Sequence, residues 1–181
     1  MSETALKIRL FPDPCLRKKC SPVAKVTAKH RDILSKMAQA MYDGMGIGLA
    51  APQVGINEQM IVVDIGSGLY KLINPKVVKK QGTQKLSEGC LSIPEVCVKV
   101  RRARKVKVCA LGEDGKALDI EAEDLLACVL QHEIDHLKGN LIIDYASLLE
   151  KLKIKTKLAG LKKLSKKMNA GLGARACQLE L

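Results

Sequence analysis

The chain has 181 residues, enough for one domain and an extension. It contains no Trp, one Phe and three Tyr, which requires an aliphatic core and argues against a surface that stacks nucleic-acid bases. The formal net charge of +12 favours an anionic partner. Seven cysteines without a C-x-x-C pair, with no signal sequence and no run of about 18 apolar residues, predict a cytoplasmic protein with reduced thiols.

The N-terminal part predicts an arm followed by a helix. Residues 1–26 contain three prolines among basic residues, which is typical of an extended, irregular segment. Thr27 can cap a helix that runs to about Asp43, because apolar residues recur there at helical spacing. We interpret this helix as one that packs against the core.

Residues 44–55, GMGIGLAAPQVG, surround one amide side chain, Gln53, with small residues. Gly44 ends the preceding helix. Gly46 and Gly48 allow a positive φ and a close approach of a ligand to the backbone. The two glycines do not complete a dinucleotide-binding G-x-G-x-x-G motif. The residues alone are consistent with a ligand-binding loop and with a structural turn.

The middle of the chain predicts strands. β-Branched runs and alternating apolar residues indicate strands in 59–65, in 69–78 with a break at Pro75, in part of 79–87, and in 96–100, 105–111 and 117–122. The last two form a hairpin across a glycine-containing turn. Cys90 follows a glycine just before a proline-terminated turn; by itself it indicates a buried thiol, as we expect for most of the cysteines.

A helix over about 124–138, ended by Gly139, carries the sequence His132-Glu133-Ile134-Asp135-His136. Residues four apart lie on one helix face, so the two imidazoles can share one metal ion. Glu133 is then close enough to accept and return a proton of a water bound to that metal. A surface helix with two titratable histidines would match the same short pattern.

Two histidines do not complete a metal site. A third histidine at position 142 would indicate a known protease class, but Ile142 occupies that position. Glu150, Asp144 and Cys90 are the candidate third ligands. A thiolate with two imidazoles suits zinc or ferrous iron and leaves a position for water.

The C-terminal part, residues 146–181, predicts a basic helix over about 146–170 and a tail. Leucines alternate with lysines there, and residues 151–175 contain no acid. The helix either folds back on the domain with a solvated charged face or binds an anionic partner.

Three stretches together resemble the signature motifs of the peptide deformylase family. They are GIGLAAPQ at 46–53, EGCLS at 88–92 and QHEIDH at 131–136, and they match in identity, order and spacing. The resemblance covers about residues 5–145. It implies a catalytic domain over 1–145 and an α+β fold in which antiparallel β-sheets surround a central metal-binding helix, with a C-terminal helix.

The resemblance also implies an activity and a set of roles. Such an enzyme hydrolyses the N-formyl group of formyl-methionine on newly synthesised polypeptides. Its metal is usually Fe²⁺, with Zn²⁺, Ni²⁺ or Co²⁺ able to replace it. Cys90, His132 and His136 would be the ligands, Glu133 the general base and acid, and Gln53 and the Leu91 N–H the donors to the formyl oxygen. Ribosomal RNA is the implied anionic partner of the C-terminal helix, and we expect a monomer without membrane contact.

A slot for the methionine side chain is expected beside the two histidines. Leu125, Cys128 and Val129 share the face of His132, and Gly48 lets the substrate backbone lie against the loop. The expected lining of the slot consists of Ile47, Leu86, Leu91, Leu125, Cys128 and Val129.

One departure from the family lies after the second motif, where Val96 and Cys97 stand in place of a substrate-contacting arginine. Arg102 either compensates for it or pairs with Glu88 near Cys90. Two other functions compete with deformylation: a metallopeptidase that uses Glu150 as its third ligand, and an RNA-binding protein with a structural metal.

Overall fold

The computed structural model describes residues 5–168, an α+β fold with three α-helices and seven strands in this range. Three short 3-10 helices cover Pro14–Arg17, Ala51–Val54 and Ile142–Asp144. The strands and helices are β1 (Gly48–Ala50), β2 (Met60–Val63), β3 (Tyr70–Gln81), β4 (Gln84–Glu88), β5 (Val98–Arg102), β6 (Lys105–Leu111), β7 (Ala117–Glu123), α1 (Ala28–Asp43), α2 (Asp124–His136) and α3 (Leu148–Met168).

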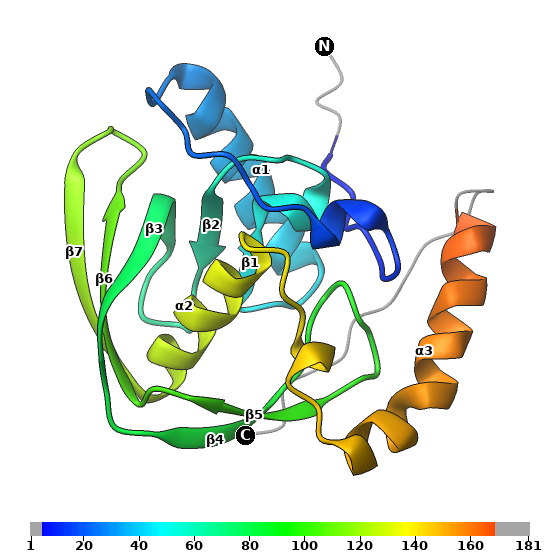
Figure 1. The fold of residues 1–181 in the computed structure, drawn as a ribbon. Helices are drawn as coiled ribbons and strands as arrows, with labels where there is room; N and C mark the ends of the chain where they lie inside the picture. Colours follow the sequence, from blue (N-terminus) through cyan, green and yellow to red (C-terminus); the bar gives the residue numbers. More distant parts are fainter. Residues whose placement is uncertain (1–4, 169–181) are drawn as a thin grey trace.

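Two antiparallel sheets enclose α2. The larger has the strand order β1-β2-β3-β6-β7, and β4 pairs with β5 in the smaller one. Figure 1 shows α2 between the curved large sheet and the β4–β5 pair, so its side chains can meet residues from both sheets. The predicted arrangement of antiparallel sheets around a central helix, with a further C-terminal helix, is confirmed.

Local sequence explains the ends of the first two helices. Thr27 precedes the first residue of α1, as predicted, and its N–H donates to His30 Nδ1 at 3.0 Å across the first turn. Past the end of α2, Gly139 has a φ of +79°. A Cβ at this glycine would overlap the backbone oxygen of Arg17, so both conformation and space require glycine there.

The proline in the predicted strand over 69–78 does not break it. β3 continues through Pro75, and the pairing with β6 shifts from Ile73↔Leu111 to Lys76↔Cys109. The bulge absorbs the extra residue because Asn74 adopts a φ of +53°, which asparagine tolerates better than most residues. The Asn74 amide also holds both backbone groups of Val23 at 2.8 Å. The predicted break was therefore wrong.

The core is aliphatic, as the composition predicts. Its largest fully buried side chains are those of Leu16, Leu34, Met37, Met41, Leu49, Met60, Ile61, Leu72, Ile73, Ile93, Leu130 and Leu141. The cysteines fit the prediction only in part: Cys20, Cys90 and Cys128 are buried, Cys15 and Cys109 are half-buried and Cys97 is exposed, while Cys177 lies outside the described residues.

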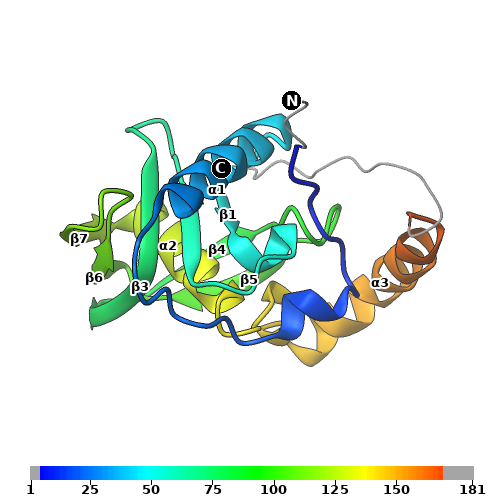
Figure 2. The ribbon, with the colours of Figure 1, turned by 90° about the horizontal axis from the view of Figure 1, so that it is seen from above.

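The C-terminal helix α3 lies on the outside of the molecule (Figures 1 and 2). It buries Ile154 and Leu161 in the same apolar cluster that contains Cys90. The leucines of its first turns, Leu148, Leu149 and Leu152, are exposed. The division of the chain after residue 145 stays a prediction. Within residues 5–168, no helix is long and apolar enough to cross a membrane.

Candidate active site

The structure brings Cys90, His132 and His136 together. The thiol follows β4 and both imidazoles lie on α2, and one ligand atom from each residue falls within 4.8 Å of the others. Cys90 Sγ is 3.3 Å from His136 Nε2, which is 3.2 Å from His132 Nε2. All three side chains are buried. Converging sulfur and nitrogen atoms of this kind suit zinc or ferrous iron.

The neighbours of the histidines fit a cation at this point. His132 donates from Nδ1 to Glu88 Oε2 at 2.9 Å, which leaves Nε2 with a lone pair directed at the cluster. Burial lowers the pKa of His132, but its contacts with Cys90 and Glu88 outweigh burial and raise that pKa well above its ordinary value. Burial and the charge of His132 lower the pKa of His136. The lowered pKa favours a neutral His136 ring, which can offer a nitrogen lone pair to a cation.

Glu133 lies beside the cluster with an uncommitted carboxylate oxygen. The side chain is buried, and its Oε2 accepts no hydrogen bond from the described residues. Burial raises the pKa of Glu133 to about 7, which suits a group that takes and returns a proton near neutral pH. A nearby metal cation would lower this pKa.

The glycines of the first motif provide space rather than a positive φ. Neither Gly46 nor Gly48 has a positive φ, which corrects the sequence-based expectation. A Cβ at Gly48 would overlap the Glu133 carboxylate, and one at Gly46 would lie 2.6 Å from Leu91 Cδ1. Any larger residue at position 48 would displace the candidate general base.

The orientation of Gln53 is fixed by its backbone surroundings. Its Oε1 accepts from the Ala50 N–H at 2.8 Å, so its NH₂ group must face the other way. There Nε2 donates to Ser92 Oγ at 3.1 Å and lies 3.5 Å from Cys90 Sγ. The amide therefore points a donor at the three candidate metal ligands. Ser92 belongs to the second motif, but its contact with Gln53 was not predicted from the sequence.

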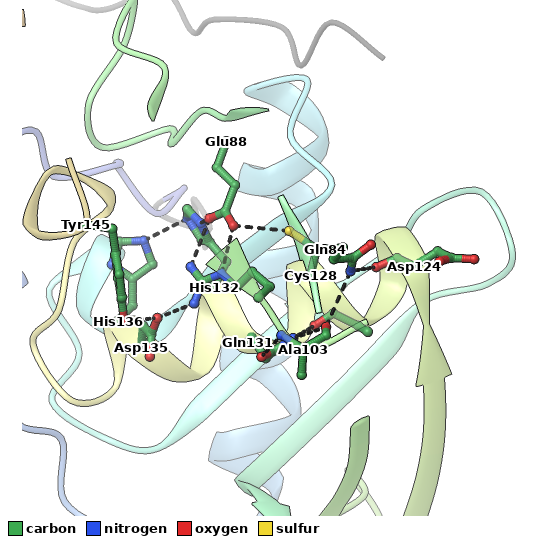
Figure 3. A network of polar contacts seen from close by, with 12 residues as sticks. Gln84, Glu88, Ala103, Asp124, Cys128, Gln131, His132, Asp135, His136 and Tyr145 are labelled. Carbon is green, nitrogen blue, oxygen red and sulfur yellow. Dashed lines mark hydrogen bonds and ion pairs between the residues drawn. The ribbon is translucent and has the colours of Figure 1, made fainter. Parts of the chain in front are cut away.

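A network of charged side chains contacts His132 through Glu88 (Figure 3). Arg102 donates from Nε and Nη2 to the two oxygens of Glu88 at 2.7 and 2.9 Å. Its Nη1 donates to Asp135 Oδ2 at 2.5 Å, and the Tyr145 hydroxyl donates to the same oxygen at 2.7 Å. Arg102 is thus committed to Glu88 and Asp135, as one of the two alternatives for Arg102 predicts, and does not face a substrate. Asp135 and Tyr145 were missed, because only the fold brings them to Arg102.

A cavity of about 310 Å³ opens beside Glu133. Every residue of the expected methionine slot, together with Gly48 and Gln53, lines it. The other candidate metal ligands lie elsewhere: Glu150 accepts from Ser147 and from the Lys99 N–H, and Asp144 pairs with Arg17. Neither belongs to the cluster, so the described residues do not support a site that uses them.

Comparison with known proteins identifies the family to which this chain belongs. The family model described as polypeptide deformylase matches residues 5–152. The chain belongs to the polypeptide deformylase family. It is 50% identical over 139 residues to the peptide deformylase of Thermoanaerobacter pseudethanolicus, covering 77% of this chain and 87% of that one. It is 52% identical over 135 residues to that of Syntrophomonas wolfei, covering 75% and 89%.

Solved structures agree with this family. A peptide deformylase from Legionella pneumophila superposes with a TM-score of 0.84 at 39% identity, covering 91% of this chain and 99% of that one. A plant peptide deformylase gives a TM-score of 0.86 at 34% identity, covering 98% and 99%. The chain is accordingly a hydrolase that removes the N-formyl group from newly synthesised polypeptides, and its family depends on a metal.

Proposed function

We propose that Cys90, His132 and His136 hold Fe²⁺, with Zn²⁺, Ni²⁺ or Co²⁺ able to take its place, and that Glu133 transfers the proton during deformylation. The convergence of these three ligand atoms beside Glu133 carries the proposal. A metal at this point supplies Lewis acidity that brings the pKa of a water towards 7. Affinity series place several divalent metals above iron, so metal supply decides which one is bound.

Glu133 acts twice in this proposal. Its free Oε2 accepts the proton of the attacking water and then returns it to the nitrogen of the leaving amine. The position of Glu133 against Gly48 keeps the carboxylate facing the cavity. Removing it should stop turnover while leaving the three ligand atoms in place.

Gln53 and Leu91 are the proposed donors to the formyl oxygen. The Ala50 contact holds the Gln53 Nε2 towards the cluster. The Leu91 N–H makes no hydrogen bond within the described residues, so it is available to a substrate. Both donors would stabilise the negative charge that develops on that oxygen, and loss of one such donor typically costs about 3 kcal/mol.

The methionine side chain enters the cavity beside α2 in this proposal. The wall there is formed by Leu125, Cys128 and Val129, and the opposite side by Ile47, Leu86 and Leu91. An unbranched thioether of moderate length fits such a lining because it packs in irregular apolar space. The backbone of the peptide lies along the loop at Gly48 as an added strand.

Formate release from a formyl-Met tripeptide by the iron-loaded protein tests the catalytic proposal. We expect turnover by the unmodified protein, and at least a 100-fold loss in Glu133→Ala, the order of magnitude seen when a positioned acid–base group is removed. Glu150→Ala is the matched control and should keep full activity, because the half-buried Glu150 carboxylate is bound to Ser147 and the Lys99 N–H and is not one of the three clustered ligands. No formate from the iron-loaded protein would refute the proposal.

Cys90→Ser should lose most of its metal and activity, whereas a metallopeptidase with Glu150 as ligand would keep both.

The proposal extends to docking of α3 on the ribosome by a monomeric cytoplasmic enzyme. Between residues 151 and 168 the helix carries lysines and no acid, and Lys153 and Lys163 are exposed. Charged surfaces of this kind bind RNA phosphates with strong salt dependence. Because α3 also buries Ile154 and Leu161, charge reversal tests this better than truncation.

Co-sedimentation with ribosomes measures the docking. The double variant Lys153→Glu, Lys163→Glu should sediment less than the unmodified protein while tripeptide turnover persists. Lys79→Glu, Lys80→Glu is the matched control, since these two lysines are exposed on β3. Equal sedimentation of both variants would count against α3 as the docking element. Light scattering at the mass of one chain is the expected result for a monomer.

A further inference from the structure

Glu88, which supports His132, receives more hydrogen bonds than its arginine partner supplies. Oε1 accepts from Arg102 Nε and also lies 3.2 Å from Cys128 Sγ. Oε2 accepts from Arg102 Nη2 and from His132 Nδ1. Each carboxylate oxygen thus has one guanidinium donor and one further donor. Figure 3 shows Glu88 linked to His132 on one side and to the Cys128 sulfur on the other.

We propose that Cys128 is a positioning residue of the metal site: its thiol donates to Glu88 and holds the carboxylate in the orientation that directs His132 Nε2 at the metal. This inference rests on the proposed metal ligation by Cys90, His132 and His136. It gives Cys128 a role beyond lining the methionine slot. A thiol and an apolar side chain would fill that slot equally well, but only the thiol can bond Glu88.

The geometry explains why one more donor matters. An ionised carboxylate offers about four lone-pair sites, and the buried Glu88 can satisfy them only with protein groups. Without the thiol, Oε1 keeps Arg102 alone, while Oε2 keeps two donors. A carboxylate held unevenly can rotate towards its better-satisfied oxygen, and His132 would follow because its Nδ1–H is bonded there.

The thiol is kept in the form that can donate. Burial raises the pKa of Cys128, and the negative charge of Glu88 raises it further, so the sulfur keeps its proton at neutral pH. Cys128 is also buried, at 4% exposure, on the same helix as His132, so its position relative to the imidazole is set by one rigid element. The two cysteines that line the cavity therefore differ in role: Cys90 offers sulfur to a metal, and Cys128 offers a proton to Glu88.

Paired variants separate the hydrogen bond from the packing. Cys128→Thr and Cys128→Val have almost the same shape, but only threonine can donate. Affinity for Zn²⁺ and Co²⁺ is measured by competition with a chelator. We expect Cys128→Val to bind about 10-fold more weakly than Cys128→Thr, the lower range for loss of a group that orients a metal ligand. Cys128→Ser, which adds no methyl group, should stay within about threefold of the unmodified protein.

Two controls make the result interpretable. Val129→Ala enlarges the same slot without touching Glu88, so it should raise KM for the formyl-Met substrate and leave metal affinity unchanged. Equal metal affinity of Cys128→Thr and Cys128→Val, both folded by circular dichroism, would overturn the inference. If valine fails to fold, weak binding by Cys128→Ser would overturn it as well. His132→Ala tests the underlying ligation, because wild-type metal affinity in that variant would refute the proposed function itself.

Discussion

Two ion pairs between a basic side chain and a glutamate differ in their exposure to solvent. One lies beside α2 in the interior, and the other lies on the outer face of β6 and β7. The side chains of Arg102 and Glu88 are 5% and 3% exposed. Those of Lys105 and Glu123, which pair across β6 and β7, are 48% and 55% exposed. The first pair orients a candidate metal ligand, because Glu88 accepts from His132. The second pair lies on two strands that are already joined by backbone hydrogen bonds.

The two pairs differ in energy because only an exposed charge can exchange its partner for water. A solvated lysine that loses its carboxylate is hydrated by water, so exposed pairs contribute about 0–1 kcal/mol. A buried carboxylate has no water to replace its donors, and loss of one partner leaves an uncompensated charge. Burial lowers the stability of Glu88 as an anion, but Arg102 and His132 overcome this and hold its pKa at about 2. The buried network is thus costly to break, whatever its net stabilisation.

Arg102→Met is expected to have the largest effect, because it leaves both Glu88 and Asp135 without their arginine. Removal of one member of a buried charge network typically costs about 3–5 kcal/mol. Urea unfolding in the presence of a chelator measures this loss without a contribution from metal. The neighbouring Arg101→Met is the control: Arg101 is exposed on the other face of β5, and its loss should stay within about 0.5 kcal/mol. Equal destabilisation by the two variants would remove the distinction between buried and exposed charges.

Asp135→Asn should have an intermediate effect. The oxygen Oδ2 of Asp135 accepts from both Arg102 and the Tyr145 hydroxyl, and the side chain is 15% exposed. Asparagine retains one accepting oxygen but loses the charge, so we expect a loss of about 1.5–3 kcal/mol, the range for hydrogen bonds to charged groups. The same chelator-treated urea unfolding measures it. Asp119→Asn, on the exposed face of β7, should change the unfolding free energy by less than about 0.5 kcal/mol.

The half-exposed pair of Arg17 and Asp144 provides a pH-dependent case between these limits. Burial raises the pKa of Asp144, but the Arg17 and Leu141 donors outweigh it, and the net pKa lies below the ordinary 3.8. A carboxyl whose folded-state pKa is lowered stabilises the fold above its unfolded-state pKa, and this stabilisation is lost as the pH falls through the folded value. With side chains 42% and 40% exposed, the contribution should be below about 1 kcal/mol.

Unfolding of the wild type and of Asp144→Asn between pH 7 and pH 2 tests this pair. We expect the wild type to be more stable at pH 7, with the difference constant down to about pH 5 and shrinking below about pH 4. A difference that grows on acidification would show that the sign of the Asp144 shift is wrong.

The sequence predicted the parts of the site that lie close together in the chain. His132, Glu133 and His136 follow from the spacing of one helix, and Gln53 from its glycine-rich loop. Cys90 remained one of three candidates until the family resemblance selected it, because nothing in local spacing links β4 to α2. The path from Arg102 to Asp135 and Tyr145 was invisible, since it joins β5, α2 and the segment before α3 only in three dimensions. The wrong break at Pro75 has the same origin: a strand proline is tolerated where a bulge and a left-handed asparagine accept it.

The smallest expected effect is that of Lys105→Ala on the outer face of the hairpin. Lys105 Nζ lies 2.7 Å from Glu123 Oε1, a shorter contact than the 2.9 Å from His132 Nδ1 to Glu88 Oε2. If distance determined the strength of a charge contact, this variant would be among the most destabilised. Because both partners are about half exposed, we expect a change in unfolding free energy of at most about 0.5 kcal/mol, falling further in 1 M salt. A loss above about 2 kcal/mol would mean that the β6–β7 pairs hold the large sheet in place, and that burial does not separate the two groups of ion pairs.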